Sequence, residues 1–198
     1  MVGKTRETAQ EDVRGSGPSG DRDQVCLDTR PDGSDGRLYC GCVLSADSQY
    51  RYALTRTWQL EQPWALWVML NPSTATHTAD DPTIRKCTGF TRRWALGGFA
   101  VVNLFGFRAT FPRHLQEVAD PVGPNNDAHI RTLLTTAERI VCAWGNHGIL
   151  HNRSEKVVSI LREHKRKETP LVCLGKTKEG IPRHPLHLAY ATELEKFS

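Results

Sequence analysis

The sequence lacks several features that would assign it to a common protein class. No run of about 18 apolar residues is present, so we expect no transmembrane helix. The first residues contain no apolar core of a secretory signal, which favours a cytoplasmic protein. There is no glycine-rich loop of the Walker or dinucleotide-binding kind and no Gly-x-Ser-x-Gly elbow. The usual motifs for binding phosphates or activating a serine are therefore missing.

Metal-ligand patterns are also weak. His147 and His151 are four residues apart, but no glutamate adjoins them and Gly148 intervenes. Cys26, Cys40 and Cys42 leave a metal or cluster site open as an alternative, although their spacing matches no zinc pattern. We favour plain packing and expect no metal and no cofactor. In a cytoplasmic chain all six cysteines should be reduced thiols, several of them buried: Cys26, Cys40, Cys42, Cys87, Cys142 and Cys173.

The charge of the chain is unevenly distributed. Its 198 residues are 38% hydrophobic and 24% charged, which suits one globular domain, expected over residues 23–198. Residues 1–22 are rich in glycine, serine and charge, so we predict a disordered tail. Residues 1–36 carry five Lys/Arg against eight Asp/Glu, whereas the remainder carries 21 against 14. This basic body is compatible with nucleic acid as a partner, and equally with an ordinary soluble surface.

Apolar runs and turn signals predict an α/β fold. Residues 37–45 and 50–58 read as a strand pair. Asp81 can cap a helix over residues 80–98, with Pro82 in its first position and Gly97 and Gly98 at its end. Strands and helices then alternate, which indicates a mostly parallel sheet. The four strands expected in that sheet are residues 64–70, 98–105, 139–145 and 170–175, and two further helices are expected at 125–138 and 154–167.

Polar side chains follow each of the four predicted strands. The first strand ends on Asn71-Pro72-Ser73, and the second runs into Asn103. The third is followed by Asn146 and His147, and the last by Lys176 and then the loop "GIPRHPLHL". In open α/β sheets ligands bind beyond the carboxyl ends of the strands. We therefore expect these side chains to line a binding site.

These motifs together resemble the uracil-DNA glycosylase superfamily. "MLNPS", "FAVVNLFGFRAT", "VCAWGNHG" and "GIPRHPLHL" are similar, in the correct order over residues 65–190, to its Asn-Pro, central Asn, Trp-Gly and His-Pro motifs. The resemblance implies a three-layer α/β/α fold with a central, mostly parallel four-stranded sheet. At full length the sequence also resembles the family catalogued as domain of unknown function 1643, through "LNPSTA", "DDPTIR", "NLF", "FRAT" and "RHPL".

The glycosylase resemblance implies roles for particular residues. Asn71 would orient the attacking water, Asn103 would read the pyrimidine edge, and His184 would stabilise the departing base as a neutral imidazole. Asp80 could assist the water. The remaining candidates would contact substrate: Ser73, Lys176 and Arg183 at phosphates, Leu186 or Leu188 as a wedge, His77 or Phe90 stacked on the base, and Phe105. Each has a structural alternative, since asparagines tie down turns and Asp80 can serve as a helix cap.

The resemblance implies a monofunctional DNA glycosylase that flips a base out of DNA and leaves an abasic site. Strict uracil enzymes carry a tyrosine where this chain has Ser73, so the loop leaves room for a 5-modified pyrimidine. A hydroxymethylated or glucosylated phage base would suit a role in antiviral defence, and uracil stays open. The water-positioning role predicts that Asn71→Asp is tolerated and Asn71→Ala is not.

Two other functions remain open from the sequence. One is a hydrolase or transferase acting on free nucleotides, and the other is a non-catalytic nucleic-acid-binding module. We expect DNA as the partner, no membrane association and no obligate protein partner.

Overall fold

The structure, a computed structural model, describes residues 22–31 and 36–198. The predicted disordered tail lies outside these ranges, apart from Arg22. No helix in the described part of the chain is both long and apolar enough to cross a membrane.

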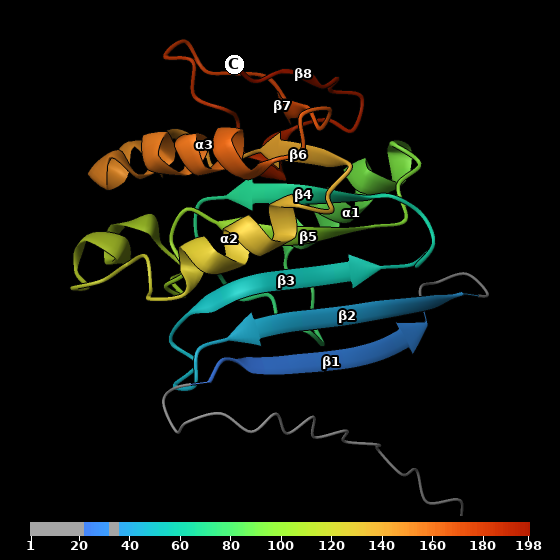
Figure 1. The fold of residues 1–198 in the computed structure, drawn as a ribbon, viewed down its shortest axis with the longest axis horizontal. Helices are drawn as coiled ribbons and strands as arrows, with labels where there is room; N and C mark the ends of the chain where they lie inside the picture. Colours follow the sequence, from blue (N-terminus) through green and yellow to red (C-terminus); the bar gives the residue numbers. More distant parts are fainter. Residues whose placement is uncertain (1–21, 32–35) are drawn as a thin grey trace, which may run out of the picture.

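The strands from residue 24 to residue 196 join into one sheet (Figure 1). Its order is β1-β2-β3-β5-β4-β6-β7-β8. The bounds are β1 Gln24–Pro31, β2 Arg37–Leu44, β3 Arg51–Thr57, β4 Trp64–Met69, β5 Gly98–Asn103, β6 Arg139–Cys142, β7 Leu171–Cys173 and β8 Glu195–Lys196.

The sheet is mixed rather than mostly parallel. The four strands predicted from the apolar runs all form, and β5, β4, β6 and β7 pair in parallel. However, β1, β2 and β3 extend one edge and β8 the other, all by antiparallel pairing. The prediction of a mostly parallel four-stranded sheet is therefore wrong for the whole sheet. The predicted hairpin does form as β2 and β3, but it attaches to β5 instead of standing apart.

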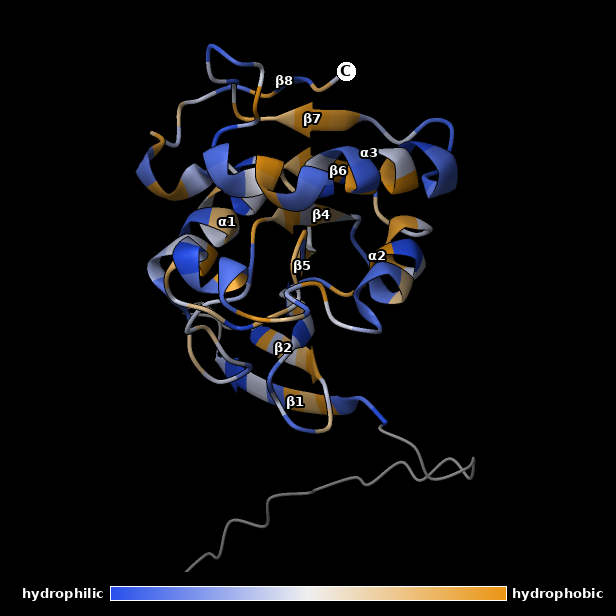
Figure 2. Ribbon diagram, turned by 90° about the vertical axis from the view of Figure 1, so that its left-hand side faces the viewer, coloured by the Kyte–Doolittle hydropathy of each residue, from blue (hydrophilic) through white to orange (hydrophobic). Residues whose placement is uncertain are grey.

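Helices cover both faces of the sheet. Helix α1 (Pro82–Arg93) packs on one face, and α2 (Asn126–Leu134) and α3 (Arg153–His164) pack on the other, as Figure 2 shows. The described residues also form three short 3₁₀ helices: η1 at Pro112–Gln116, η2 at Asn146–Asn152 and η3 at Pro185–His187. Strands β4 and β5 are covered on both faces, which explains why nearly all of their residues are apolar.

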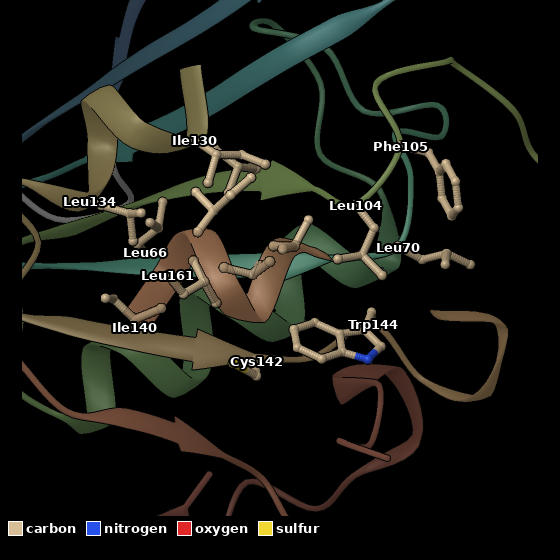
Figure 3. Close-up of a cluster of buried hydrophobic side chains, with 14 of the residues drawn as sticks. Leu66, Leu70, Leu104, Phe105, Ile130, Leu134, Ile140, Cys142, Trp144 and Leu161 are labelled. Atoms are coloured by element: carbon tan, nitrogen blue, oxygen red, sulfur yellow. The ribbon is translucent and has the colours of Figure 1, made fainter. Parts of the chain in front are cut away.

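Alternation along β4 divides the core in two. Leu66 and Val68 point to α2 and α3, where they meet Ile130, Leu161 and neighbouring apolar side chains (Figure 3). Trp67 points to α1 on the other face. The last residues of β4 and β5 are thus fixed from both sides, and the loops that follow leave the sheet from a rigid base.

Helix α1 begins as predicted and ends early. The carboxylate of Asp81 accepts a hydrogen bond of 2.8 Å from the Ile84 amide, and Pro82 is the first helical residue. The helix ends at Arg93, before the predicted glycine stop. Ala95 takes a left-handed conformation, with φ 55°, and turns the chain toward β5.

Candidate functional site

A cleft of about 740 Å³ lies where β4, β5, β6 and β7 end. Its walls come from the loop after β4, the end of β5, the start of η2 and the loop after β7. Seven of the predicted site residues line it: Asn71, Ser73, Asn103, Arg183, His184, Leu186 and Leu188. The expectation that polar side chains after the strands meet at one edge of the sheet is confirmed for the five polar members of this set.

Asn71 lines this cleft, and hydrogen bonds within its own loop fix its side-chain amide. Its Nδ2 donates to the carbonyl oxygens of Pro72, at 2.9 Å, and Ala109, at 2.6 Å. Carbonyls only accept, so the network assigns the orientation of the amide. Oδ1 accepts no hydrogen bond from the described part of the chain. Asn71 is therefore a fixed acceptor, able to hold a water molecule by one of its protons.

His184 is a neutral donor at ordinary pH. The pKa of His184 is lowered from 6.5 to about 4, chiefly by burial and also by the nearby His187, while Asp81 opposes the shift. Its Nδ1 accepts a hydrogen bond of 3.3 Å from the Leu186 amide, so the ring proton is assigned to Nε2. The loop itself is held by the Gly145 amide, which donates to Pro182 at 2.9 Å. His184 can thus donate one hydrogen bond without carrying charge.

Asn103 carries an unpaired group at the bottom of the cleft. The residue is 1% exposed, and its Nδ2 has no hydrogen-bond partner within the described residues. A buried polar group without a partner costs about 1–3 kcal/mol. An acceptor on a bound molecule would remove that cost, so this amide favours a ligand with a polar edge.

Arg51 also lines the cleft, although no pattern in the sequence marks it as a site residue. A shift in register at Leu44 leaves Tyr52 without a partner in β2, so β3 contains a bulge. Leu54 packs toward α1, and strict alternation from it would turn Arg51 toward α2. Instead Tyr52 stacks on His129 of α2, and Arg51 reaches the cleft on the side of α1.

Arg51 is a buried cation that forms no salt bridge with a carboxylate of the described residues. It is 4% exposed, Nη1 donates to the carbonyl oxygen of Ala75, and Nε is unpaired. The pKa of its guanidinium is lowered to about 10, chiefly by burial, and Asp81 opposes the shift. Asp81 is the only carboxylate lining the cleft among the described residues, and it makes no salt bridge with Arg51. The cleft is thus suited to an anionic ligand.

Five predicted site residues lie elsewhere. Asp80 pairs with buried Arg56, at 2.6 Å, and with Arg30, at 3.1 Å, so it holds the loop to the sheet instead of assisting water. Lys176 forms an ion pair with Glu195 at 3.6 Å. The other three are Phe90 and Phe105, both fully buried in the core, and His77, which lies beside Cys42.

The structure also differs from the prediction in the residues available to stack on a base or to act as a wedge. Among the described residues that line the cleft, Trp144 is the only tryptophan, tyrosine or phenylalanine. Trp144 follows β6. The sequence therefore places it near the predicted site, but no motif indicates that its ring would contact a base. Leu188 is buried against the α1-side core, so it cannot act as a wedge. Leu186 is half-buried at the cleft and stays a prediction.

Comparison with known proteins adds a family but no activity. A family model described as "Protein of unknown function (DUF1643)" matches residues 51–186, which is more than half of the chain. No curated protein and no solved structure matches the sequence.

Proposed function

The chain belongs to the family described as "Protein of unknown function (DUF1643)", and we propose that it is a monofunctional DNA glycosylase. It would hydrolyse the N-glycosidic bond of a modified pyrimidine and leave an abasic site. The observation that carries this proposal is the convergence of Asn71, Asn103 and His184 in one cleft, although 113 positions separate the first from the last. A fixed acceptor, a polar reader and an uncharged donor are the groups that this hydrolysis requires.

In the proposed reaction the bond between C1′ of the sugar and the base nitrogen breaks, and its electron pair leaves with the base. The sugar then carries oxocarbenium character. A water molecule held by Asn71 Oδ1 adds its oxygen to C1′ and loses a proton to solvent, and the base takes up a proton. Because the electrophile is nearly a cation, the water needs orientation more than deprotonation, which suits an amide.

His184 and Asn103 act on the base. The Nε2 proton of His184 donates to the oxygen on which negative charge develops, in the manner of an oxyanion-hole donor. A neutral imidazole suits this task because it donates a hydrogen bond to the developing anion without the cost of holding a charged ring in a buried position. The Nδ2 group of Asn103 gains the partner that it lacks, and the amide oxygen accepts from the same base edge.

Cations around the cleft suit the DNA backbone. Arg183 is exposed at the cleft, whereas Arg51 is buried and pairs with no carboxylate in the part of the chain that the structure describes. Arg108 lies in an adjoining groove with Ser73 and Thr74, and its Nε is also unpaired. Arginine forks bind phosphate oxygens in pairs, so a flipped nucleotide could place its 5′ and 3′ phosphates among these groups.

The size of the cleft supports a modified base. Pockets of about 300–1,000 Å³ enclose drug-sized ligands, and a volume of about 740 Å³ lies well within that range. Ser73 and Thr74 line it with short hydroxyl side chains. These features support a pyrimidine with a bulky polar substituent, such as a glucosylated hydroxymethylcytosine in phage DNA, over unmodified uracil. Excision of such a base would serve antiviral defence.

The fold is compatible with this proposal. Four parallel strands with helices on both faces, and a site at their carboxyl ends, are the arrangement that the glycosylase resemblance implies. We also place the protein in the cytoplasm, where its six free cysteines would stay reduced.

A glycosylase assay on defined DNAs tests the proposal. The panel contains uracil, 5-hydroxymethyluracil, 5-hydroxymethylcytosine and glucosylated phage genomic DNA, each single- and double-stranded where available. We expect alkali-labile abasic sites in at least one modified DNA, released with the matching free base in equal amount.

The other outcomes separate the alternatives. Salt-dependent DNA binding with every strand intact would overturn the glycosylase and favour a binding module. An absence of both binding and excision would direct attention to free nucleosides and nucleotides, whose hydrolysis is followed by chromatography of the released base.

The pH profile of excision should show the neutral state of His184. Its pKa is lowered from 6.5 to about 4, so the ring stays uncharged as the pH falls through 6.5. We expect no loss of rate from this group between about pH 5 and pH 8, the range in which ordinary histidines titrate. The acid limb should begin near pH 4, where protonated Nδ1 would face the donating amide of Leu186.

Two variants identify that limb with His184. His184→Phe should lower the rate about 10²-fold and His184→Gln, which keeps an N–H donor, should lose less. His164→Gln alters a histidine at the end of α3 and should keep the wild-type profile. An acid limb near pH 6.5 in the wild type would contradict the assignment.

A further inference from the structure

A cluster of three potential metal ligands lies apart from the residues that line the cleft. Cys26 of β1 and Cys42 of β2 are paired in the antiparallel register. His77, in the loop between β4 and α1, brings its Nδ1 to 3.8 Å from the Cys42 sulfur. The ligand atoms of the three residues all lie within 4.8 Å of one another. We propose that Cys26, Cys42 and His77 bind one Zn²⁺ ion.

The distances suit tetrahedral zinc. Zinc lies about 2.3 Å from thiolate sulfur and about 2.0–2.1 Å from imidazole nitrogen. In a tetrahedron those bonds separate sulfur from nitrogen by about 3.6 Å and two sulfurs by about 3.8 Å. The 3.8 Å between His77 Nδ1 and Cys42 Sγ is close to such an edge. The other two separations are within 4.8 Å, so each has to shorten by at most about 1 Å.

The three side chains also suit zinc chemically. Two thiolates and an imidazole are ligands that select Zn²⁺ over Mg²⁺ or Ca²⁺. Zinc binding replaces the two thiol protons, which leave to solvent, while the imidazole coordinates in its neutral form through Nδ1 and keeps its proton on Nε2. Cys26 and His77 are half-buried, so solvent ions can reach the cluster. Three protein ligands leave one coordination position for water.

The site would join two separate parts of the chain. Cys26 belongs to the edge strand β1 and Cys42 to its neighbour β2, both before the family match begins at residue 51. His77 belongs to the loop that starts at Asn71. Arg30 of β1 already donates to the Thr78 carbonyl of this loop at 2.8 Å. Zinc would add a strong link at the same junction, so we expect it to stabilise the loop that carries Asn71.

Metal binding by the full chain tests the inference directly. Purified protein is analysed for zinc content, stripped with a chelator under reducing conditions, and titrated with Co²⁺ while the sulfur-to-cobalt charge-transfer absorption is followed. We expect one equivalent of metal per chain, the spectrum of a tetrahedral thiolate complex, and displacement of cobalt by zinc. No thiolate–cobalt absorption, or a mass two hydrogens lower from a Cys26–Cys42 disulfide in the purified protein, would overturn the proposal.

Variants identify the ligands. Cys42→Ser and His77→Gln should each weaken cobalt binding at least about tenfold. Loss of a residue that only hydrogen-bonds to a metal ligand already costs about that much, and loss of the ligand itself should cost more. Cys40→Ser is the matched control, because Cys40 is also buried in β2 but lies outside the cluster. Unchanged binding in Cys42→Ser, or equal loss in Cys40→Ser, would contradict the ligand assignment. These measurements use no DNA, so their result is independent of the glycosylase proposal.

Discussion

Replacement of Asn71 by alanine should lower the rate of base excision about 10²–10³-fold, comparable to removal of an oxyanion-hole donor in other enzymes. The substitution removes the acceptor that would orient the water, whereas the contacts of Asn103 and Arg51 with substrate stay in place. The rate constant of the chemical step, measured in single-turnover assays, should therefore fall. The affinity for modified DNA, measured by anisotropy, should change little. A full rate in Asn71→Ala would exclude the water-positioning role.

The structure reverses the sequence-based expectation for Asn71→Asp. The Asn71 Nδ2 group lies 2.9 Å and 2.6 Å from two carbonyl oxygens, which both require a donor. A carboxylate would place an oxygen against them, and repulsion would displace the loop. We expect Asn71→Asp to be nearly as inactive as Asn71→Ala at pH 7, with partial recovery at lower pH, where the protonated acid can donate once.

A matched control keeps this result interpretable. Asn152→Asp makes the same chemical change at an exposed position with φ 53°, a conformation that aspartate accepts. It should keep the wild-type rate and melting temperature. If Asn71→Asp were as active as the wild type at pH 7, the amide orientation assigned here would be wrong.

The apolar strands of the fold were predictable, and the edge strands were only partly so. Residues 64–70 and 98–105 are buried on both faces, so their side chains must be apolar and the strands stand out in the sequence. Strand β1, "QVCLDTRP", lies at the edge with half-buried and exposed side chains. Backbone pairing with β2 holds it there, and that pairing leaves no apolar pattern in the sequence.

The candidate site likewise contains residues that the sequence predicts and residues that it does not. Asn71, Asn103 and His184 could be predicted because strand ends in a parallel sheet share one edge. Arg51 could not, because a single extra residue in β3 reverses the direction of its side chain. Phe90 and Phe105 were wrong as base contacts for a related reason, since only packing shows that both rings are enclosed by the core. The proposed zinc site depends on His77, which is 35 positions from Cys42 and matches no short motif.

Replacement of Arg51 by methionine should separate function from stability. Arg51 and Arg153 are both buried arginines, but Arg153 pairs with Asp127 and also donates to the Leu104 carbonyl oxygen. Arg51 has one carbonyl partner and no salt bridge with a described carboxylate. The free energy lost with that hydrogen bond is about 1 kcal/mol, and removal of an uncompensated buried charge offsets it.

We therefore expect Arg51→Met to keep or raise the melting temperature while it lowers kcat/KM about 10²-fold, the effect of losing a charged contact of about 3 kcal/mol to substrate. Arg153→Met should instead destabilise the fold by about 3–5 kcal/mol, because it leaves Asp127 without its buried partner.

Thermal unfolding and excision kinetics of the two variants measure both quantities. Such a function-specific loss is typical of residues whose burial serves a ligand. A large drop in melting temperature for Arg51→Met, equal to that of Arg153→Met, would show that the cation stabilises the fold, and the cleft would then need another group to hold an anion.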